Sequence, residues 1–144
     1  MSQNTKVDPE KLAAAFPVVD PEFKPFGERV LVQIRTPKFK SSGGIILPKD
    51  ARETEKWNTQ VGKIIAVGET AFKNRDTLQP WPEGDWAKVG DFVRVPKHGG
   101  DRWEVLIPGR RGNDDEDYAM FVLTRDLDLG GLLLGDPLAV IAFV

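Results

Sequence analysis

The sequence predicts an all-β domain, either a small barrel or a sandwich, and three observations support this prediction. About six short segments alternate apolar and polar residues, as residues on the two faces of a strand do. Turns rich in glycine and proline separate these segments, as in Pro-Trp-Pro-Glu-Gly-Asp at residues 80–85. Only one short stretch has helical character. Because bare sheet edges promote aggregation, we expect the sheet to close on itself or to share its edges with neighbouring subunits.

The first expected element is a short helix over residues 8–16. Asp8 can accept hydrogen bonds from the free amides at the start of a helix, and Pro9 suits the first helical position. Pro17 and Pro21 then end the helix. A helix this short is marginal unless it packs against another element, so a partly ordered leader is the alternative for residues 1–22.

The β pattern begins after residue 26. The expected strands cover residues 28–34, 60–67, 91–95, 103–107, 118–123 and 138–144. Alternation predicts a common face for Val30, Val32 and Ile34 in the first strand, for Val61, Ile65 and Val67 in the second, and for Trp103, Val105 and Ile107 in the fourth. With 144 residues, the chain is one domain and large enough to bury a core.

Composition excludes several classes of function. A hydrophobic content of 40% with 29% charged residues is ordinary for a soluble globular protein. The net charge of −2, without a basic stripe, gives no reason to expect nucleic acid as a partner. No apolar run approaches the roughly 20 residues that span a bilayer, and residues 1–10 lack a secretory apolar stretch. The absence of cysteine suits a reducing compartment, so we expect a cytoplasmic protein.

The residues that enzymes use are also missing. His98 is the only histidine and there is no cysteine, so the common zinc sites cannot be assembled. Neither a phosphate-binding loop, nor a dinucleotide fingerprint, nor a nucleophile elbow occurs. The acidic residues 113–117 lack the spacing of a calcium loop and are expected to form a solvated hairpin tip. The tryptophans are expected to pack, with Trp81 bracing a loop between two prolines. The sequence therefore predicts no catalytic residue, metal or cofactor.

The segment most informative about function is Ser-Ser-Gly-Gly-Ile-Ile-Leu-Pro at residues 41–48. Charged residues flank it on both sides, including Lys38, Lys40 and Lys49. Such surroundings resist burial, so the three aliphatic residues have no obvious core of their own. The pattern is typical of an apolar segment on a soluble loop that binds another protein. An ordinary β-strand after a Gly43-Gly44 hairpin turn is the alternative.

A second segment, Gly-Gly-Leu-Leu-Leu at residues 130–134, has the same form. It could be a second binding segment, a subunit contact, or packing for the N-terminal helix. We expect packing, because a persistently exposed run of leucines favours aggregation.

Five segments resemble, in the same order, the GroES-type co-chaperonins of the chaperonin-10 family. Residues 23–32, Phe-Lys-Pro-Phe-Gly-Glu-Arg-Val-Leu-Val, are similar to the family's opening Pro-Leu-x-Asp-Arg-Val strand. The others are Gly-Gly-Ile-Ile-Leu-Pro at 43–48, Gly-Lys-Ile-Ile-Ala-Val-Gly at 62–68, Val-Gly-Asp-Phe-Val at 89–93 and Asp-Pro-Leu-Ala-Val-Ile at 136–141. Together they span most of residues 23–144.

The resemblance implies a GroES-like β-barrel over residues 23–144 that acts in a homo-oligomeric, heptameric ring. The ring would cap a GroEL-type chaperonin and close the folding chamber for client proteins, with ATP hydrolysis in the partner. A mobile loop at about 38–56 would carry the chaperonin-binding residues Gly43, Gly44, Ile45, Ile46 and Leu47. A roof hairpin would cover about 70–87. The subunit interface would use Phe26, Val30, Val32, Leu138, Val140 and Ile141.

Three departures and two alternatives limit this reading, and one departure is that residues 101–112 do not align cleanly with the family. Typical members lack the extension at 1–22 and the insertion at about 127–135; such extra length is similar to that of co-chaperonins from large bacteriophages. The first alternative is a self-assembling structural or decoration barrel without a chaperonin partner. The second is the GroES-like domain of medium-chain dehydrogenases, which would need zinc ligands and a Rossmann partner domain.

Overall fold

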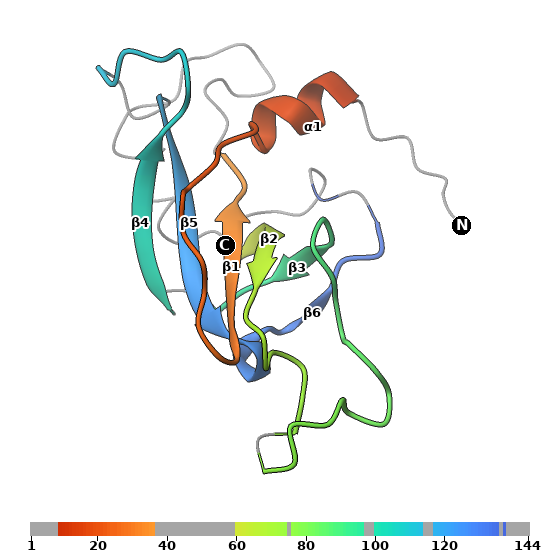
Figure 1. The fold of residues 1–144 in the computed structure, drawn as a ribbon. Coiled ribbons are helices and arrows are strands. Elements are labelled where there is room, and N and C mark those ends of the chain that lie inside the picture. The colour runs from red at the N-terminus through yellow and green to blue at the C-terminus, as the bar shows by residue number, and fades with distance from the viewer. Residues whose placement is uncertain are drawn as a thin grey trace.

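Six strands form one antiparallel sheet in this computed structural model, which describes residues 9–36, 60–74, 76–96, 100–113, 117–135 and 137 (Figure 1). The strands are β1 (Arg29–Ile34), β2 (Val61–Val67), β3 (Phe92–Arg94), β4 (Asp101–Leu106), β5 (Tyr118–Arg125) and β6 (Gly131–Leu132). Their order across the sheet is β4-β5-β1-β2-β3-β6. The described residues add one α-helix, α1 (Pro9–Ala15), and one 3-10 turn, η2 (Asp126–Asp128). The prediction of an all-β fold with a short N-terminal helix is confirmed.

Strand β1 occupies the centre of the sheet. It pairs with β2 on one side and with β5 on the other, where Leu31 lies opposite Leu123. Every residue from Val30 to Ile34 is at most 2% exposed. The strand is therefore buried on both faces, and neither of its edges is free.

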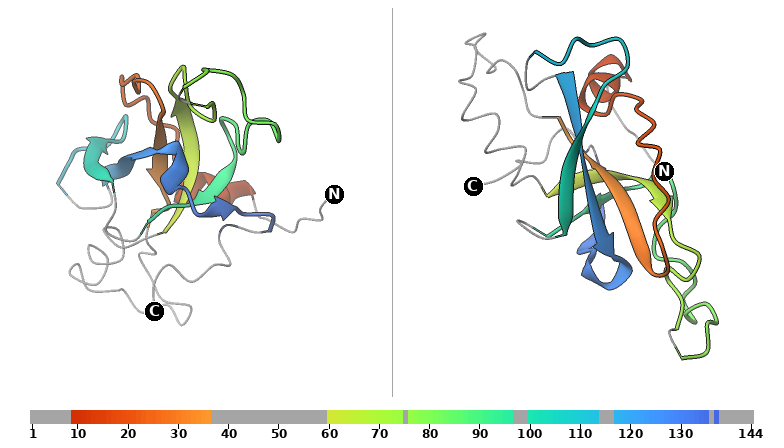
Figure 2. Two further views of the ribbon diagram at one scale, coloured as in Figure 1. Left: turned by 90° about the horizontal axis from the view of Figure 1, so that it is seen from below. Right: turned by 60° about the vertical axis from the view of Figure 1, so that its left-hand side comes forward.

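Two apolar cores lie on opposite faces of the sheet, and the alternation of β1 divides its side chains between them. The first core contains Val30, Val32, Ile34, Ile64, Ala71, Phe72, Ala87, Val93, Val95, Met120 and Val122. The second core contains Val19, Leu31, Ile107, Ala119 and Phe121, with Trp103 and Val105 packed against it. The common faces predicted for the first and fourth strands are thus confirmed. Figure 2 shows how strongly the strands twist across the sheet.

Strand β2 corrects one prediction. Val32 pairs with Ile64 and Leu31 with Ala66, so Ile65 is an extra residue on β2 at a shift in register. Such a bulge interrupts the alternation of faces. Ile64 is consequently fully buried in the first core, while Val67 is 39% exposed. The expectation that Val61, Ile65 and Val67 share one face is wrong, because it continued a strict alternation through the bulge. Val67 lies opposite Val30 of the first core, whereas Ile65 packs against the second.

Helix α1 lies within the stretch for which the sequence predicts a helix. The residue that follows it, Phe16, is 5% exposed, and its ring lies 5.1 Å from that of Phe92 in β3. A helix of 7 residues is too short to be stable alone, so this packing supplies the tertiary support that it needs. No helix among the residues described is long and apolar enough to cross a membrane.

The leucine run after β5 forms strand β6 through its backbone. The Gly130 amide donates to the Arg94 carbonyl at 2.9 Å, and the Leu133 amide to the Phe92 carbonyl at 2.8 Å. Leu132 remains 43% exposed and Leu134 88% exposed. The expected packing is therefore wrong for these two side chains, because the segment is attached to the sheet by its backbone. The strand predicted at residues 138–144 lies outside the described residues.

Candidate functional site

The candidate site is the end of the sheet at which β1 ends and β2 begins. Residues 37–59 connect the two strands and lie outside the described residues, as do Gly43, Gly44, Ile45, Ile46 and Leu47. The described ends of this connection meet in the sheet: the Arg35 amide donates to the Val61 carbonyl at 3.0 Å. Hairpin connections usually have about 2–5 residues, and much longer loops in compact domains are usually functional. The topology therefore places a long connection between two adjacent, hydrogen-bonded strands.

The strand ends beside this connection are tightly packed. A Cβ atom at Gly62 would lie 2.3 Å from Val32 Cγ1 and 3.0 Å from the Gln33 carbonyl oxygen, so only glycine fits. The side chain of Arg35 is 7% exposed, and its Nη1 donates to the Pro137 carbonyl at 2.6 Å. The connection thus begins and ends at fixed points. Sequence reasoning missed Arg35, because an arginine after an alternating strand looks like an ordinary solvated residue.

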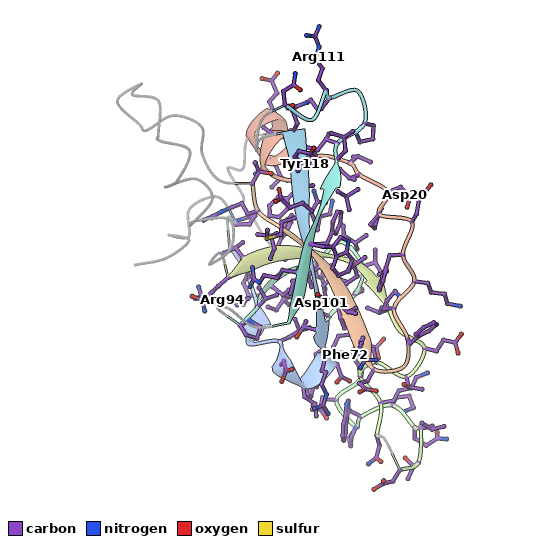
Figure 3. The ribbon with its side chains drawn as sticks, turned by 90° about the vertical axis from the view of Figure 1, so that its left-hand side faces the viewer. Asp20, Phe72, Arg94, Asp101, Arg111 and Tyr118 are labelled. Carbon is purple, nitrogen blue, oxygen red and sulfur yellow. The ribbon has the colours of Figure 1, made fainter. Side chains whose placement is uncertain are left out.

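The segment between β2 and β3 leaves the opposite end of the sheet. Figure 1 shows it extending away from the end where α1 lies, and Figure 3 places Phe72 in the lower half of the view, with Arg111 at the top. It covers the residues, about 70–87, for which a roof hairpin is predicted. An isolated bridge pairs Lys73 with Pro80, and Asn74 Oδ1 accepts a 2.8 Å bond from the Asp76 amide. The described ends of the 37–59 connection, at Arg35 and Val61, and the segment between β2 and β3 therefore lie at opposite ends of the sheet.

Aromatic rings stabilise this second segment. Trp86 lies 6.3 Å from Trp81, with the rings 10° from parallel, and 6.0 Å from the buried ring of Phe72. Trp81 also packs against the first core, in agreement with its predicted bracing role. Trp86 Nε1 donates to Glu83 Oε2 at 3.1 Å. A backbone hydrogen bond, and then this indole bond, lower the pKa of Glu83 because they favour the carboxylate.

Asp126 anchors the same segment, and sequence reasoning missed it. Its side chain is fully buried, and Oδ2 accepts a 2.8 Å hydrogen bond from the Phe72 amide. Oδ1 accepts another, also of 2.8 Å, from the Leu127 amide. Phe72 has a φ of +61°, a conformation that non-glycine residues rarely adopt. No sequence signal distinguishes Asp126 from an acidic residue that simply ends a strand.

The predicted interface residues fall into three groups. Phe26 is 77% exposed. Val30 and Val32 are fully buried in the first core, on a strand that is paired on both sides. Leu138, Val140 and Ile141 lie outside the described residues. Among the predicted interface residues in the described part of the chain, Phe26 is therefore the one that lies on the surface.

The acidic tip predicted at 113–117 is described only at its two ends. Asp117 Oδ2 accepts bonds of 3.0 Å from the amides of both Gly112 and Asn113, and Oδ1 lies 3.6 Å from Arg110 Nη1. This carboxylate is thus engaged in stabilising the turn. Within the described ranges, no group of three His, Cys, Asp or Glu residues could hold a metal ion.

Comparison with known proteins shows what the chain is similar to. Residues 22–121 match the family model of the chaperonin 10 kDa subunit. The chain is 38% identical over 89 residues to the co-chaperonin GroES of Pelagibacter ubique, an alignment that covers 62% of this chain and 82% of that protein. It is 35% identical over 87 residues to the co-chaperonin GroES of Lacticaseibacillus zeae, which covers 60% and 83%. The family match ends within β5, so α1, η2 and β6 lie outside it.

Proposed function

The chain belongs to the chaperonin 10 kDa subunit family of co-chaperonins, and from this premise we propose that it caps a GroEL-type chaperonin ring and closes the chamber for folding client proteins. The observation that carries the proposal is the family match over residues 22–121. The family is one of non-catalytic chaperones. In this proposal ATP is hydrolysed by the partner ring, in the cytoplasm, and this chain supplies no catalytic group.

The proposed contact with the chaperonin is made by Ile45, Ile46 and Leu47. Burying three such side chains gains about 1.5–3 kcal/mol each, or roughly 5–9 kcal/mol in all. Ordering a loop of about ten residues costs about 1 kcal/mol or more per residue. Gly43 and Gly44 add backbone freedom, which increases that cost but permits conformations closed to other residues. One loop alone is therefore expected to bind weakly.

Several loops on one ring overcome this weakness. Once one loop is bound, the others experience a high effective concentration, so weak contacts combine into firm but reversible capping. We propose a heptameric ring in which Phe26 contacts the neighbouring subunit together with Leu138, Val140 and Ile141. Val30 and Val32 are not part of this proposal, because both are buried inside their own subunit.

The opposed positions of the two described ends of the 37–59 connection and of the segment between β2 and β3 support this arrangement. If residues 37–59 face the chaperonin, the segment with Trp81 and Trp86 faces away from it (Figure 1). That segment would then lie over the chamber, as the predicted roof hairpin requires. One sheet would thus separate the binding end from the covering end.

The direct test is an Ile46→Asp substitution. We expect it to abolish ATP-dependent co-elution with a chaperonin ring and to leave the mass of the free oligomer unchanged, because a charge replaces an apolar contact. Leu134→Asp is the matched control, since Leu134 belongs to the other leucine-containing segment and is 88% exposed. Full binding by Ile46→Asp, or loss of binding by Leu134→Asp alone, would refute the assignment of the binding segment.

Limited proteolysis separates this function from that of a self-assembling structural protein. A binding loop should be cut near Lys40 or Lys49 in the free protein and become protected when the chaperonin is bound. A segment packed permanently against a neighbouring subunit should resist cleavage in both states. Resistance in the free protein would support the structural alternative.

A further inference from the structure

An N-terminal segment that precedes the family match lies against the end of β1. The match begins at residue 22, whereas α1 covers Pro9–Ala15. The Thr36 amide donates to the Ala15 carbonyl at 2.8 Å. Thr36 is the last residue described before the connection at 37–59. Figure 1 shows α1 beside the tip of the β1 arrow, where this connection leaves the sheet.

Two apolar side chains attach this segment to the body of the protein. Phe16 is 5% exposed and contacts Phe92, and Val19 is 6% exposed in the second core. Val18, between them, is 94% exposed. From there the chain passes Asp20 along the flank of the sheet before it enters β1, as Figure 3 shows. The segment is therefore fastened on both sides of residues 17 and 18.

Polar contacts place the segment across the end of β1. Gln33, which is 2% exposed, donates from Nε2 to the Pro17 carbonyl at 2.8 Å. The pairing of β1 ends at Gln33 on the β5 side and at Ile34 on the β2 side. Thr36 therefore lies beyond both pairings, and its amide bonds to Ala15 instead of to a neighbouring strand.

We propose that residues 15–19 form a clasp that holds Thr36 and fixes the point where the β1–β2 connection leaves the sheet. In this clasp, Ala15 and Phe16 act as positioning residues for the chaperonin-binding segment. This role of the clasp rests on the proposed function. A residue that is ordered before binding loses less conformational freedom when the partner binds. The clasp therefore slows dissociation of the chaperonin without contacting it.

Hydrogen exchange in the free, full-length protein tests the clasp. We expect Phe16→Ala to raise the exchange rate of the Thr36 amide by about tenfold or more relative to the Ile64 amide, which bonds to the Asp91 carbonyl at 2.9 Å. Phe16→Leu should restore most of the protection. Val18→Ala is the matched control and should change neither rate. Equal acceleration of Thr36 and Ile64 would mean a general loss of stability and would overturn the clasp.

A second measurement tests the effect on binding. Phe16→Ala should speed dissociation from a chaperonin ring by about tenfold, because every loop of a multivalent ring is loosened. Unchanged dissociation despite faster Thr36 exchange would overturn the positioning role. Ile46→Asp should leave Thr36 exchange unchanged, so a failure of the capping proposal and a failure of the clasp give different results.

Gln33→Leu keeps the test decisive if Phe16→Ala does not fold. This substitution removes the bond to the Pro17 carbonyl and leaves the ring contact of Phe16 in place. We expect Thr36 exchange to rise in the same direction, by about threefold or more, with Ile64 unaffected. No change at Thr36 in this variant would contradict the clasp.

Discussion

At the scale of single residues, Asp126 connects segments that are distant in the sequence. Its two carboxylate oxygens accept the Phe72 and Leu127 amides, and its own amide donates to the Glu28 carbonyl at 3.1 Å. A left-handed backbone conformation such as that of Phe72 costs about 1–2 kcal/mol per residue. Hydrogen bonds to a charged acceptor contribute about 1.5–3 kcal/mol. The hydrogen bond that the Phe72 amide donates to Asp126 therefore contributes enough free energy to offset the strain at Phe72.

Substitution of Asp126 should consequently reduce stability. We expect Asp126→Ala to lower the free energy of unfolding in urea by about 2–4 kcal/mol, because the buried Phe72 amide and the partly buried Leu127 amide lose their acceptor. Asp128→Ala, in the same 3-10 turn but exposed, should change it by less than about 0.5 kcal/mol. Similar unfolding midpoints for the two variants would contradict the anchoring role of Asp126.

At the scale of elements, the fit between β1 and β2 depends on a glycine. A Cβ atom on Gly62 would collide with Val32 and approach the Gln33 carbonyl, whereas a Cβ on Gly131 in β6 would meet nothing within 4 Å. We expect Gly62→Ala to destabilise the protein by about 1–3 kcal/mol, as overpacking does. Gly131→Ala should be neutral within about 0.5 kcal/mol. Denaturation of both variants checks this, and a neutral Gly62→Ala would show that β2 can shift at this point.

Elements were predictable from the sequence where local alternation determines them. The sequence correctly predicted that Val30 and Val32 lie on the same face of their strand, because alternate residues of a strand point to the same side of a sheet. The common face predicted for β2 was wrong, because the bulge at Ile65 arises only from the pairing of β2 with β1. Strand β6 was also missed, since its attachment depends on backbone bonds to β3 rather than on its side chains.

The candidate site shows the same limit. A binding role for Ile45, Ile46 and Leu47 could be predicted because their apolar character contrasts with a charged neighbourhood, and it stays a prediction. The bond between Ala15 and Thr36 could not, because both residue types are common and only the fold brings them together. Sequence patterns thus predicted a binding segment, whereas the structure was needed to find the bond between Ala15 and Thr36.

At the scale of the whole molecule, the proposed ring depends on contacts between subunits. Phe26 is a large apolar side chain that is 77% exposed just before the central strand. Single exposed apolar side chains are common on protein surfaces, so a subunit contact at Phe26 stays a prediction.

We expect Phe26→Asp to shift the free protein from an oligomer to smaller species in native mass measurements, with its circular dichroism retained. The charge would have to be buried without a partner at the subunit contact. Val18→Asp introduces the same charge at a site that is 94% exposed and should leave the oligomer intact. An intact oligomer in the Phe26 variant would remove this residue from the interface.

The central position of β1 also has a consequence for how each subunit is made. Its partner β5 lies late in the chain, with Leu31 opposite Leu123, and only β6 follows it among the described strands. During synthesis, one edge of β1 must therefore wait unpaired while most of the polypeptide is still being translated. Folds dominated by such distant pairings form slowly and expose apolar strands in the meantime. A protein that is proposed to help other proteins fold is therefore itself prone to aggregation while it is being synthesised.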